Sequence, residues 1–195
     1  MNRVEILSIA KPILFNTEMV RAIMDGRKTV TRRVVKVNTN FLQACRAVES
    51  PVGLMTVSKI IRPPYNAGDY LYVRETWGIY EQRYMDANYI LYRADFPNGA
   101  KTFGADGVSC DLPTWRPSIH MPKAAARIFL RVTDVCAERL QDCGNMQAKD
   151  EGCTCCSQFV RIWNNTVKKS DLDRYGWDAN PWVWVIEFER VEIEP

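Results

Sequence analysis

Short segments with a two-residue repeat dominate this chain and constrain its fold more than any other feature of the sequence. In such segments successive side chains point to opposite faces, as they do in β-strands. We predict strands over residues 54–61, 70–77, 88–94, 127–135 and 182–193. Few stretches show helical spacing, and strands do not alternate with helices in a βαβ rhythm. The pattern predicts a mainly β, α+β fold in which five to six strands form a small, strongly bent sheet or barrel.

A further strand is predicted after a short helix, at a junction marked by Gly26. Asn16 or Thr17 can cap the helix, and apolar residues three to four apart give it one buried face. Gly26 stands where a helix C-cap glycine belongs. From residue 29 onward the period changes to two, which places Thr31 and Arg33 on the same face of the strand.

This junction is also the most highly charged part of the chain, with four cations and two hydroxyls in the nine residues 25–33. The whole chain has a net charge of +3, but residues 1–36 hold eight Lys and Arg against three Asp and Glu. A basic segment on a nearly neutral body favours a local anionic ligand over general coating of DNA. A lysine beside a hydroxyl and an arginine suits an anion or nucleotide site, or a catalytic one. The alternative is that these cations only complement a helix end in solvent.

Composition limits the other possibilities. A length of 195 residues suits one domain with insertions, and an apolar content of 47% is enough for a core. No apolar run approaches the length of a membrane-spanning helix, and the first residues do not form a signal peptide pattern. Seven cysteines, an odd number with three close together, favour reduced thiols and a cytoplasmic protein.

The remaining candidate motifs are weaker. Cys143, Cys153, Cys155 and Cys156 leave open a zinc or partner site, but their spacing differs from paired C-x2-C knuckles and favours free thiols. His120, the only histidine, lies in a loop bounded by prolines, where a structural or ligand-facing role suits it as well as a catalytic one. The chain has no P-loop, dinucleotide fingerprint or nucleophile elbow, so NTP hydrolysis and dinucleotide binding have no support. We therefore expect no cofactor, and the cysteine spacing leads us to expect no metal.

The strand predicted over residues 70–77 carries charge in a mostly apolar sequence. Arg74 and Glu75 point to opposite faces, and a charged residue in a buried strand needs a partner or a site. Trp77 could stack on a base, although aromatic residues in strands mostly pack in the core.

Taken together, these motifs resemble the ASCH domain superfamily, and the chain is most similar to longer ASCH-domain proteins of bacteria and their phages. Residues 26–31, Gly-Arg-Lys-Thr-Val-Thr, are similar to the family's Gly-x-Lys-x-x-Thr signature. The resemblance continues through residues 65–77 with the Gly68-Asp69 turn, and through residues 115–122, 127–135 and 175–188. It implies a PUA-like β-barrel of five to six strands with flanking helices. The implied boundaries are a single domain over residues 1–195, with insertions at about 37–66, 95–118 and 143–157.

The resemblance also implies a function, which is binding of RNA or of a nucleoside in a cleft beside the signature. A distant branch of the family hydrolyses N(4)-acetylcytidine with a lysine, a threonine and a glutamate. Lys28 and Thr31 match the first two, and Glu151 matches the third through the Ala-x-x-Glu pattern of residues 148–151. In an enzyme of that kind Lys28 would take the proton of Thr31, and Glu151 would protonate the leaving amine.

Three functions therefore stay open from the sequence. They are a binding protein, a hydrolase at the same cleft (an amidohydrolase or a ribonuclease), and a structural interaction module with a zinc or partner site at Cys143–Cys156. The expected partner is RNA, a nucleoside or a nucleotide, and no membrane. The sequence does not specify the ligand or the oligomeric state. The expected ligand-binding residues are Arg27, Lys28, Arg32, Arg33, Arg74, Glu75, Trp77 and His120.

Overall fold

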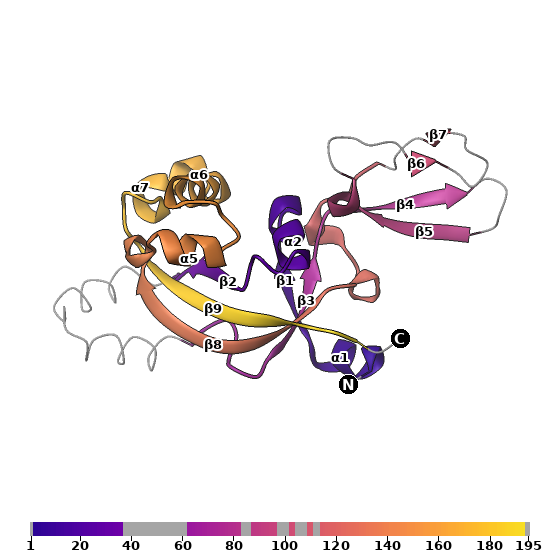
Figure 1. The fold of residues 1–195 in the computed structure, drawn as a ribbon, viewed down its shortest axis with the longest axis horizontal. Coiled ribbons are helices and arrows are strands. Elements are labelled where there is room, and N and C mark those ends of the chain that lie inside the picture. The colour runs from indigo at the N-terminus through magenta and orange to yellow at the C-terminus, as the bar shows by residue number, and fades with distance from the viewer. Residues whose placement is uncertain are drawn as a thin grey trace. The chain divides into compact units, whose positions relative to one another are not determined.

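A computed structural model describes residues 2–36, 62–82, 87–96, 102–103, 109–110 and 114–193 (Figure 1). The fold of this part is α+β, as predicted. Its helices are α1 (Arg3–Ile9), α2 (Thr17–Met24), α5 (Asn145–Asp150), α6 (Cys156–Thr166) and α7 (Leu172–Tyr175). Its strands are β1 (Lys11–Leu14), β2 (Val30–Val34), β3 (Tyr70–Arg74), β4 (Trp77–Gln82), β5 (Ala87–Tyr92), β6 (Thr102–Phe103), β7 (Ser109–Cys110), β8 (Phe129–Arg139) and β9 (Trp182–Val191).

Five strands form a mixed sheet in the order β1-β3-β8-β9-β2, and β4 and β5 form a separate antiparallel pair. The β1 strand pairs with β3 in parallel, and β2 pairs with β9 antiparallel. The described strands do not show the closed barrel that the family resemblance implies. The strand predicted over residues 54–61 and most of the insertion predicted at 37–66 lie outside the described residues.

The helix before the basic segment forms for the reasons that the sequence gives. The side chain of Asn16 accepts a hydrogen bond from the Met19 backbone N–H at 2.8 Å, which caps α2. Val20 and Ile23 are buried on its inner face. Gly26 follows the helix with φ of +71°, in the left-handed region that glycine adopts without strain.

The chain divides into two compact units, each built from several separate segments. Unit 1 contains residues 1–25, 70–130 and 190–195, and unit 2 contains residues 26–69 and 131–189. The prediction of a single domain with insertions stays a prediction. None of the described helices is long and apolar enough to cross a membrane.

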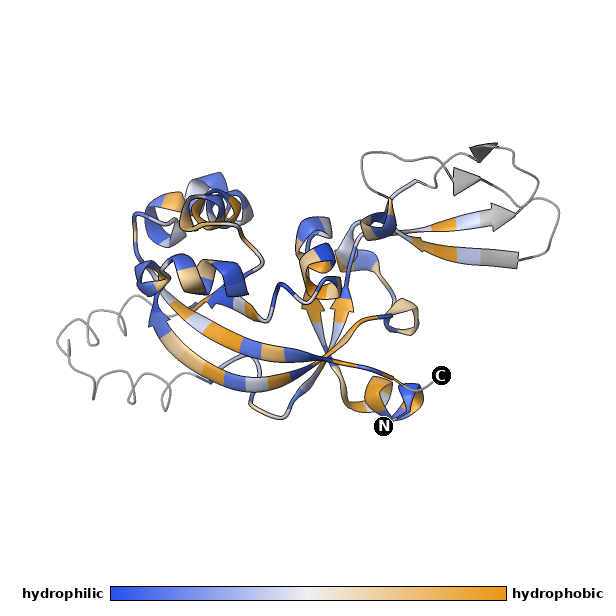
Figure 2. Ribbon diagram, viewed as in Figure 1, coloured by the Kyte–Doolittle hydropathy of each residue, from blue (hydrophilic) through white to orange (hydrophobic). Residues whose placement is uncertain are grey.

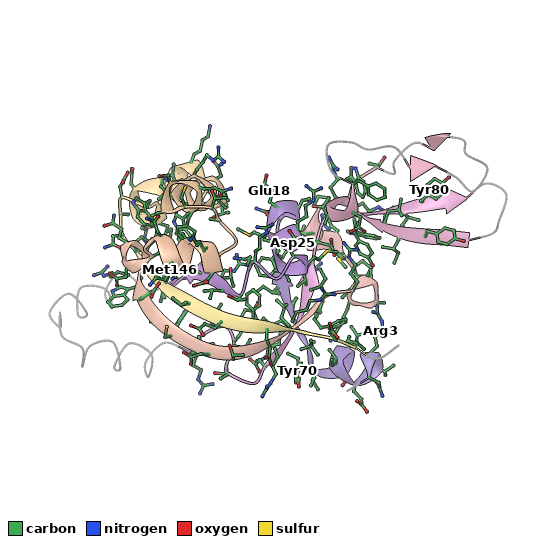
Figure 3. The ribbon with its side chains drawn as sticks, in the orientation of Figure 1. Arg3, Glu18, Asp25, Tyr70, Tyr80 and Met146 are labelled. Carbon is green, nitrogen blue, oxygen red and sulfur yellow. The ribbon has the colours of Figure 1, made fainter. Side chains whose placement is uncertain are left out.

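Unit 2 has a core in which α5 and α6 pack against β2 and β9. Phe159 and Trp163 of α6 and Val183 and Val185 of β9 are all buried in it. Trp184 and Ile186, which lie on the other face of this strand, are buried as well. The first half of β9 is therefore buried on both faces, and its exposed and buried residues alternate only from residue 186 onward. Figure 2 shows the mixture of polar and apolar residues along β8 and β9.

Candidate functional site

The basic segment lies in unit 2, where backbone contacts fix both of its sides. Lys28 forms an isolated antiparallel bridge with Glu151, directly after α5. The Thr29 N–H donates to the Asp150 carbonyl at 2.9 Å, and the Phe188 N–H donates to the Thr29 carbonyl at 2.8 Å. The lysine of the signature and the glutamate matched to it, which are 123 residues apart in the sequence, are therefore neighbours in the fold.

The Lys28 side chain points inward, and its ammonium group meets three oxygen acceptors. Nζ donates to the Glu151 carboxylate at 2.5 Å, to the Glu151 carbonyl at 3.1 Å and to the Val30 carbonyl at 2.7 Å. The side chain has no exposed surface. Three acceptors match the three hydrogens of an ammonium, so the charge is hydrogen-bonded although it is removed from water.

Glu151 joins this lysine to a second cation. One carboxylate oxygen accepts from Lys28 and the other from Arg32 at 3.1 Å. Arg32 also donates from Nε to the Glu138 carboxylate at 2.8 Å, and its guanidinium carbon lies 5.9 Å from the centre of the Phe159 ring. These four charged side chains, Lys28, Arg32, Glu138 and Glu151, form a network that we call the buried charge cluster.

Burial and charge act in opposite directions on the cations of this segment. Burial lowers the pKa of Lys28, and the Glu151 carboxylate only partly offsets this effect. Burial also lowers the pKa of Arg33, again against the attraction of Glu151. For Arg32 the neighbouring Glu151 and Glu138, with Cys143, outweigh the effect of burial and raise the pKa. The charge on Lys28 is thus the one that depends most on a single carboxylate.

Thr31, the expected nucleophile, is also buried, with 2% of its surface exposed. It lies in β2 opposite Ile186, directly after the residue whose carbonyl accepts from Lys28. Within the described ranges its hydroxyl makes no hydrogen bond to Lys28 or to Glu151. Arg27 is exposed and donates to the Gly152 carbonyl at 3.2 Å. The segment therefore has a buried interior, formed by Lys28 and Thr31, and an exposed edge at Arg27.

The other four expected ligand residues, Arg74, Glu75, Trp77 and His120, lie in unit 1. Glu75 is 1% exposed, and both of its oxygens accept hydrogen bonds from Arg127, at 2.9 and 3.0 Å. Burial raises the pKa of Glu75, and Arg127 opposes this shift. The buried charge that the sequence left unexplained in this strand thus has an ion-pair partner.

Two members of these networks were not identified from the sequence. Glu138 lies beyond residue 135, where the predicted strand ended, whereas β8 continues to Arg139. Arg127 was placed in the same strand but was not paired with Glu75, and it also binds Asp95 at 2.7 Å. Partners that are distant in the sequence leave no local pattern. The one available signal was a charged residue within a mostly apolar segment, such as Glu75, which indicates that a partner exists but not which residue it is.

The cysteines do not form a metal site in the part of the chain that the structure describes. Cys143 and Cys153 are buried in the core of unit 2, and Cys155 is exposed at the start of α6. Burial raises the pKa of Cys143 to about 12, so this thiol stays protonated at neutral pH. A pocket of about 340 Å³ is lined by residues of α6, α7 and the turn after them, including Asn164, and by none of the expected site residues.

Comparison with known proteins identifies no relative of this chain. No family model, no curated protein and no solved structure matches the chain.

Proposed function

We propose that this chain is an ASCH-like protein that binds RNA or a nucleoside at the segment formed by residues 26–33. The buried charge cluster is the observation that supports the proposal. Removing two charges from water costs several kcal/mol for each ion, and an ion pair regains that cost only with very good geometry. Because apolar residues would fill such a position at least as well, ionised groups held in a core are more typical of functional sites than of scaffolding.

The cluster also defines how the segment would meet a ligand. Lys28 has no exposed side-chain surface, so in this state it anchors the segment and does not contact a phosphate. Arg27 is exposed and Arg33 keeps part of its surface exposed, whereas Lys28 and Arg32 are buried, so a ligand in solution would meet the segment at these two arginines. A planar guanidinium suits both a phosphate and the edge of a base. In this proposal the anchored lysine positions the two arginines.

Binding of cytidine, N(4)-acetylcytidine and a short RNA, measured by calorimetry at several salt concentrations, tests the proposal. We expect Arg27→Gln and Arg33→Gln to weaken binding and to reduce its dependence on salt for the RNA. Arg131→Gln is the matched control, because it removes one exposed arginine that pairs with Glu189 in the same unit. If the two segment variants bind all three ligands as the control does, the ligand site has been placed wrongly.

A hydrolase at the same segment is the second candidate, and the contact between Lys28 and Glu151 favours it. Because burial lowers the pKa of Lys28, its neutral amine, the form that can accept a proton, is reached more readily near pH 7 than in an exposed lysine, and Glu151 is close enough to exchange a proton with it. The Thr31 hydroxyl would have to rotate towards Lys28 when substrate binds, lose its proton and attack the amide carbonyl. Glu151, having first taken a proton from the Lys28 ammonium, would give that proton to the departing amine of the base, and water would then hydrolyse the acyl ester left on Thr31.

Release of cytidine from N(4)-acylcytidines by the wild type, Lys28→Ala and Thr31→Ala tests the hydrolase. We expect both variants to lose the activity while Arg131→Gln retains it. Equal background release by all three proteins would reject the hydrolase and leave the binding function standing. We also propose the PUA-like barrel that the family resemblance implies, of which the described strands show a mixed five-strand sheet.

A further inference from the structure

Unit 1 contains a second group of cations, arranged along a stretch of chain that runs antiparallel to β3 and the start of β4. At one end, Trp77 and Arg116 exchange backbone hydrogen bonds of 3.2 and 2.7 Å. In the middle, the Arg74 guanidinium donates to the Ile119 carbonyl. At the other end, Lys123 Nζ lies 5.3 Å from the centre of the Tyr72 ring. Three successive contacts therefore align residues 116–123 with residues 72–77.

The cations of this stretch sit on aromatic rings. The guanidinium carbon of Arg116 lies 5.1 Å from the centre of the Trp77 ring, and that of Arg93 lies 5.6 Å from the centre of the Trp115 ring. Attraction to the face of a ring holds a guanidinium in place and leaves its N–H edges available to another partner, although Arg93 already donates one N–H to the Phe96 carbonyl. Arg93 belongs to the same group, because its backbone N–H donates to Thr76 between β3 and β4.

These cations also lack carboxylate partners within the described ranges. Arg74, Arg93, Arg116 and Lys123 take part in no ion pair there, whereas the nearby Arg127 pairs with two carboxylates. Residues 114–127 contain no Asp or Glu at all. Positive charge that the described residues leave unbalanced attracts a polyanion, and close spacing of several cations strengthens that attraction.

Apolar surface is exposed among the cations. Ile119 is 59% exposed, and His120 beside it is exposed as well. The residues from Tyr72 to Trp77 span about 17 Å at about 3.3 Å per residue, which is room for several nucleotides of an extended strand. Bases stack on the faces of arginine side chains and on apolar or aromatic groups, while phosphates bind the N–H edges of arginine.

We infer that this cationic ridge, which consists of Arg74, Arg93, Arg116 and Lys123 with Ile119 and His120 between them, binds single-stranded nucleic acid. An acidic peptide or a duplex would use the charges but not the exposed apolar and stacking groups. The ridge lies entirely in unit 1, so the inference does not depend on the ligand site proposed in unit 2.

Fluorescence anisotropy of the full chain with a labelled RNA of about 12 nucleotides tests the ridge, with the same sequence as single-stranded and as duplex DNA. Each lost phosphate contact lowers the slope of log K against log salt by about 0.7 for a single strand. Arg116→Gln with Lys123→Gln should therefore reduce the slope by about 1.4 and weaken binding about 25-fold at about 0.1 M salt. Lys123→Gln alone, which leaves the ring contact of Arg116 in place, should give half of the change in slope.

The matched control is Arg131→Gln with Lys169→Gln, which removes the same charge from exposed positions in unit 2. Ile119→Ser should weaken binding with no change in slope, because it removes an apolar contact and no charge. Tighter binding of the RNA or of the single-stranded DNA than of the duplex supports the inference, and the tighter of the two single strands shows whether ribose or deoxyribose is preferred. It is overturned if the ridge variants bind like the control, or if duplex DNA or polyglutamate binds as tightly as the single strands. Acylcytidine binding by the same variants separates failure of the ridge from failure of the site in unit 2.

Discussion

Replacing Glu151 by glutamine is the sharpest test of the buried charge cluster. The change keeps the size of the side chain and removes its charge, so Lys28 stays in the interior with two carbonyl acceptors and no carboxylate. Arg32 is less affected, because Glu138 still accepts from it. Breaking a buried ion pair from one side costs about 3–5 kcal/mol. For a chain of this length that loss corresponds to a fall in Tm of about 6–20 °C.

The pH dependence makes this prediction specific to Lys28. Burial already lowers the pKa of Lys28 in the wild type, and without Glu151 nothing of similar strength opposes it. The folded variant then binds fewer protons than the unfolded variant, whose lysine titrates near pH 10.4, so its stability rises with pH over the interval between the two pKa values. We expect the destabilisation of Glu151→Gln to be largest near neutral pH and to shrink towards pH 10.

Urea unfolding followed by tryptophan fluorescence at several pH values measures this destabilisation, since Trp163 packs in the core of unit 2. The double variant Lys28→Met with Glu151→Leu is the control, because apolar residues of similar size often replace a buried ion pair without loss. A destabilisation by Glu151→Gln that stays below about 0.5 kcal/mol would place it among ordinary surface substitutions and refute the argument. A large loss that does not change with pH would show that the uncompensated charge of Lys28 is not its cause.

Three further predictions concern other parts of the chain. Burial raises the pKa of Glu75, so the folded protein holds this proton more tightly than the unfolded protein does, and Glu75 stabilises the fold most when it is protonated. The difference in unfolding free energy between the wild type and Glu75→Gln should therefore decrease as pH rises above about 4.5, measured in unfolding curves over the acid range. Iodoacetamide should label Cys155 before Cys143 in mass spectra, because backbone N–H groups at the start of α6 lower the pKa of the first while burial raises that of the second; faster labelling of Cys143 would contradict the fold of unit 2. Gly26→Ala should cost about 1 kcal/mol in urea unfolding, since φ there is +71° although no neighbouring atom blocks a methyl group.

Local patterns predicted most of the regular structure. The strands expected over residues 88–94, 127–135 and 182–193 correspond to β5, β8 and β9, and the helix before Gly26 is α2. These elements have clear periodicity, which is the signal that a single sequence carries best.

The differences have physical reasons. The strand predicted over residues 70–77 is divided in two: β3 ends at Arg74 and β4 begins at Trp77, and the Glu75 backbone N–H between them donates to the Met121 sulfur and not to a carbonyl of a neighbouring strand. The α1 helix was overlooked, although Asn2 and Glu5 form a capping box that is legible in the sequence. The β1 strand was also overlooked, because it has only four residues and contains a proline.

For the candidate site, the sequence indicated which residues matter but not how they meet. The Gly-x-Lys-x-x-Thr motif identified Lys28, and the Ala-x-x-Glu pattern identified Glu151, whose contact the structure shows. No local pattern predicts that the Lys28 side chain points into the interior, since a lysine after a helix is usually solvated. Burial depends on the helices α5 and α6, which come more than a hundred residues later in the chain.

The interleaved division of the chain has a consequence for its synthesis. Unit 2 includes residues up to Glu189, and unit 1 consists of residues 1–25, 70–130 and 190–195, so neither unit can be complete until β9 has left the ribosome. Long-range pairing of this kind folds slowly and leaves apolar strands uncovered in the meantime. A nascent chain stalled before β9 should therefore be protease-sensitive throughout, and no contiguous fragment should reproduce either half of the protein.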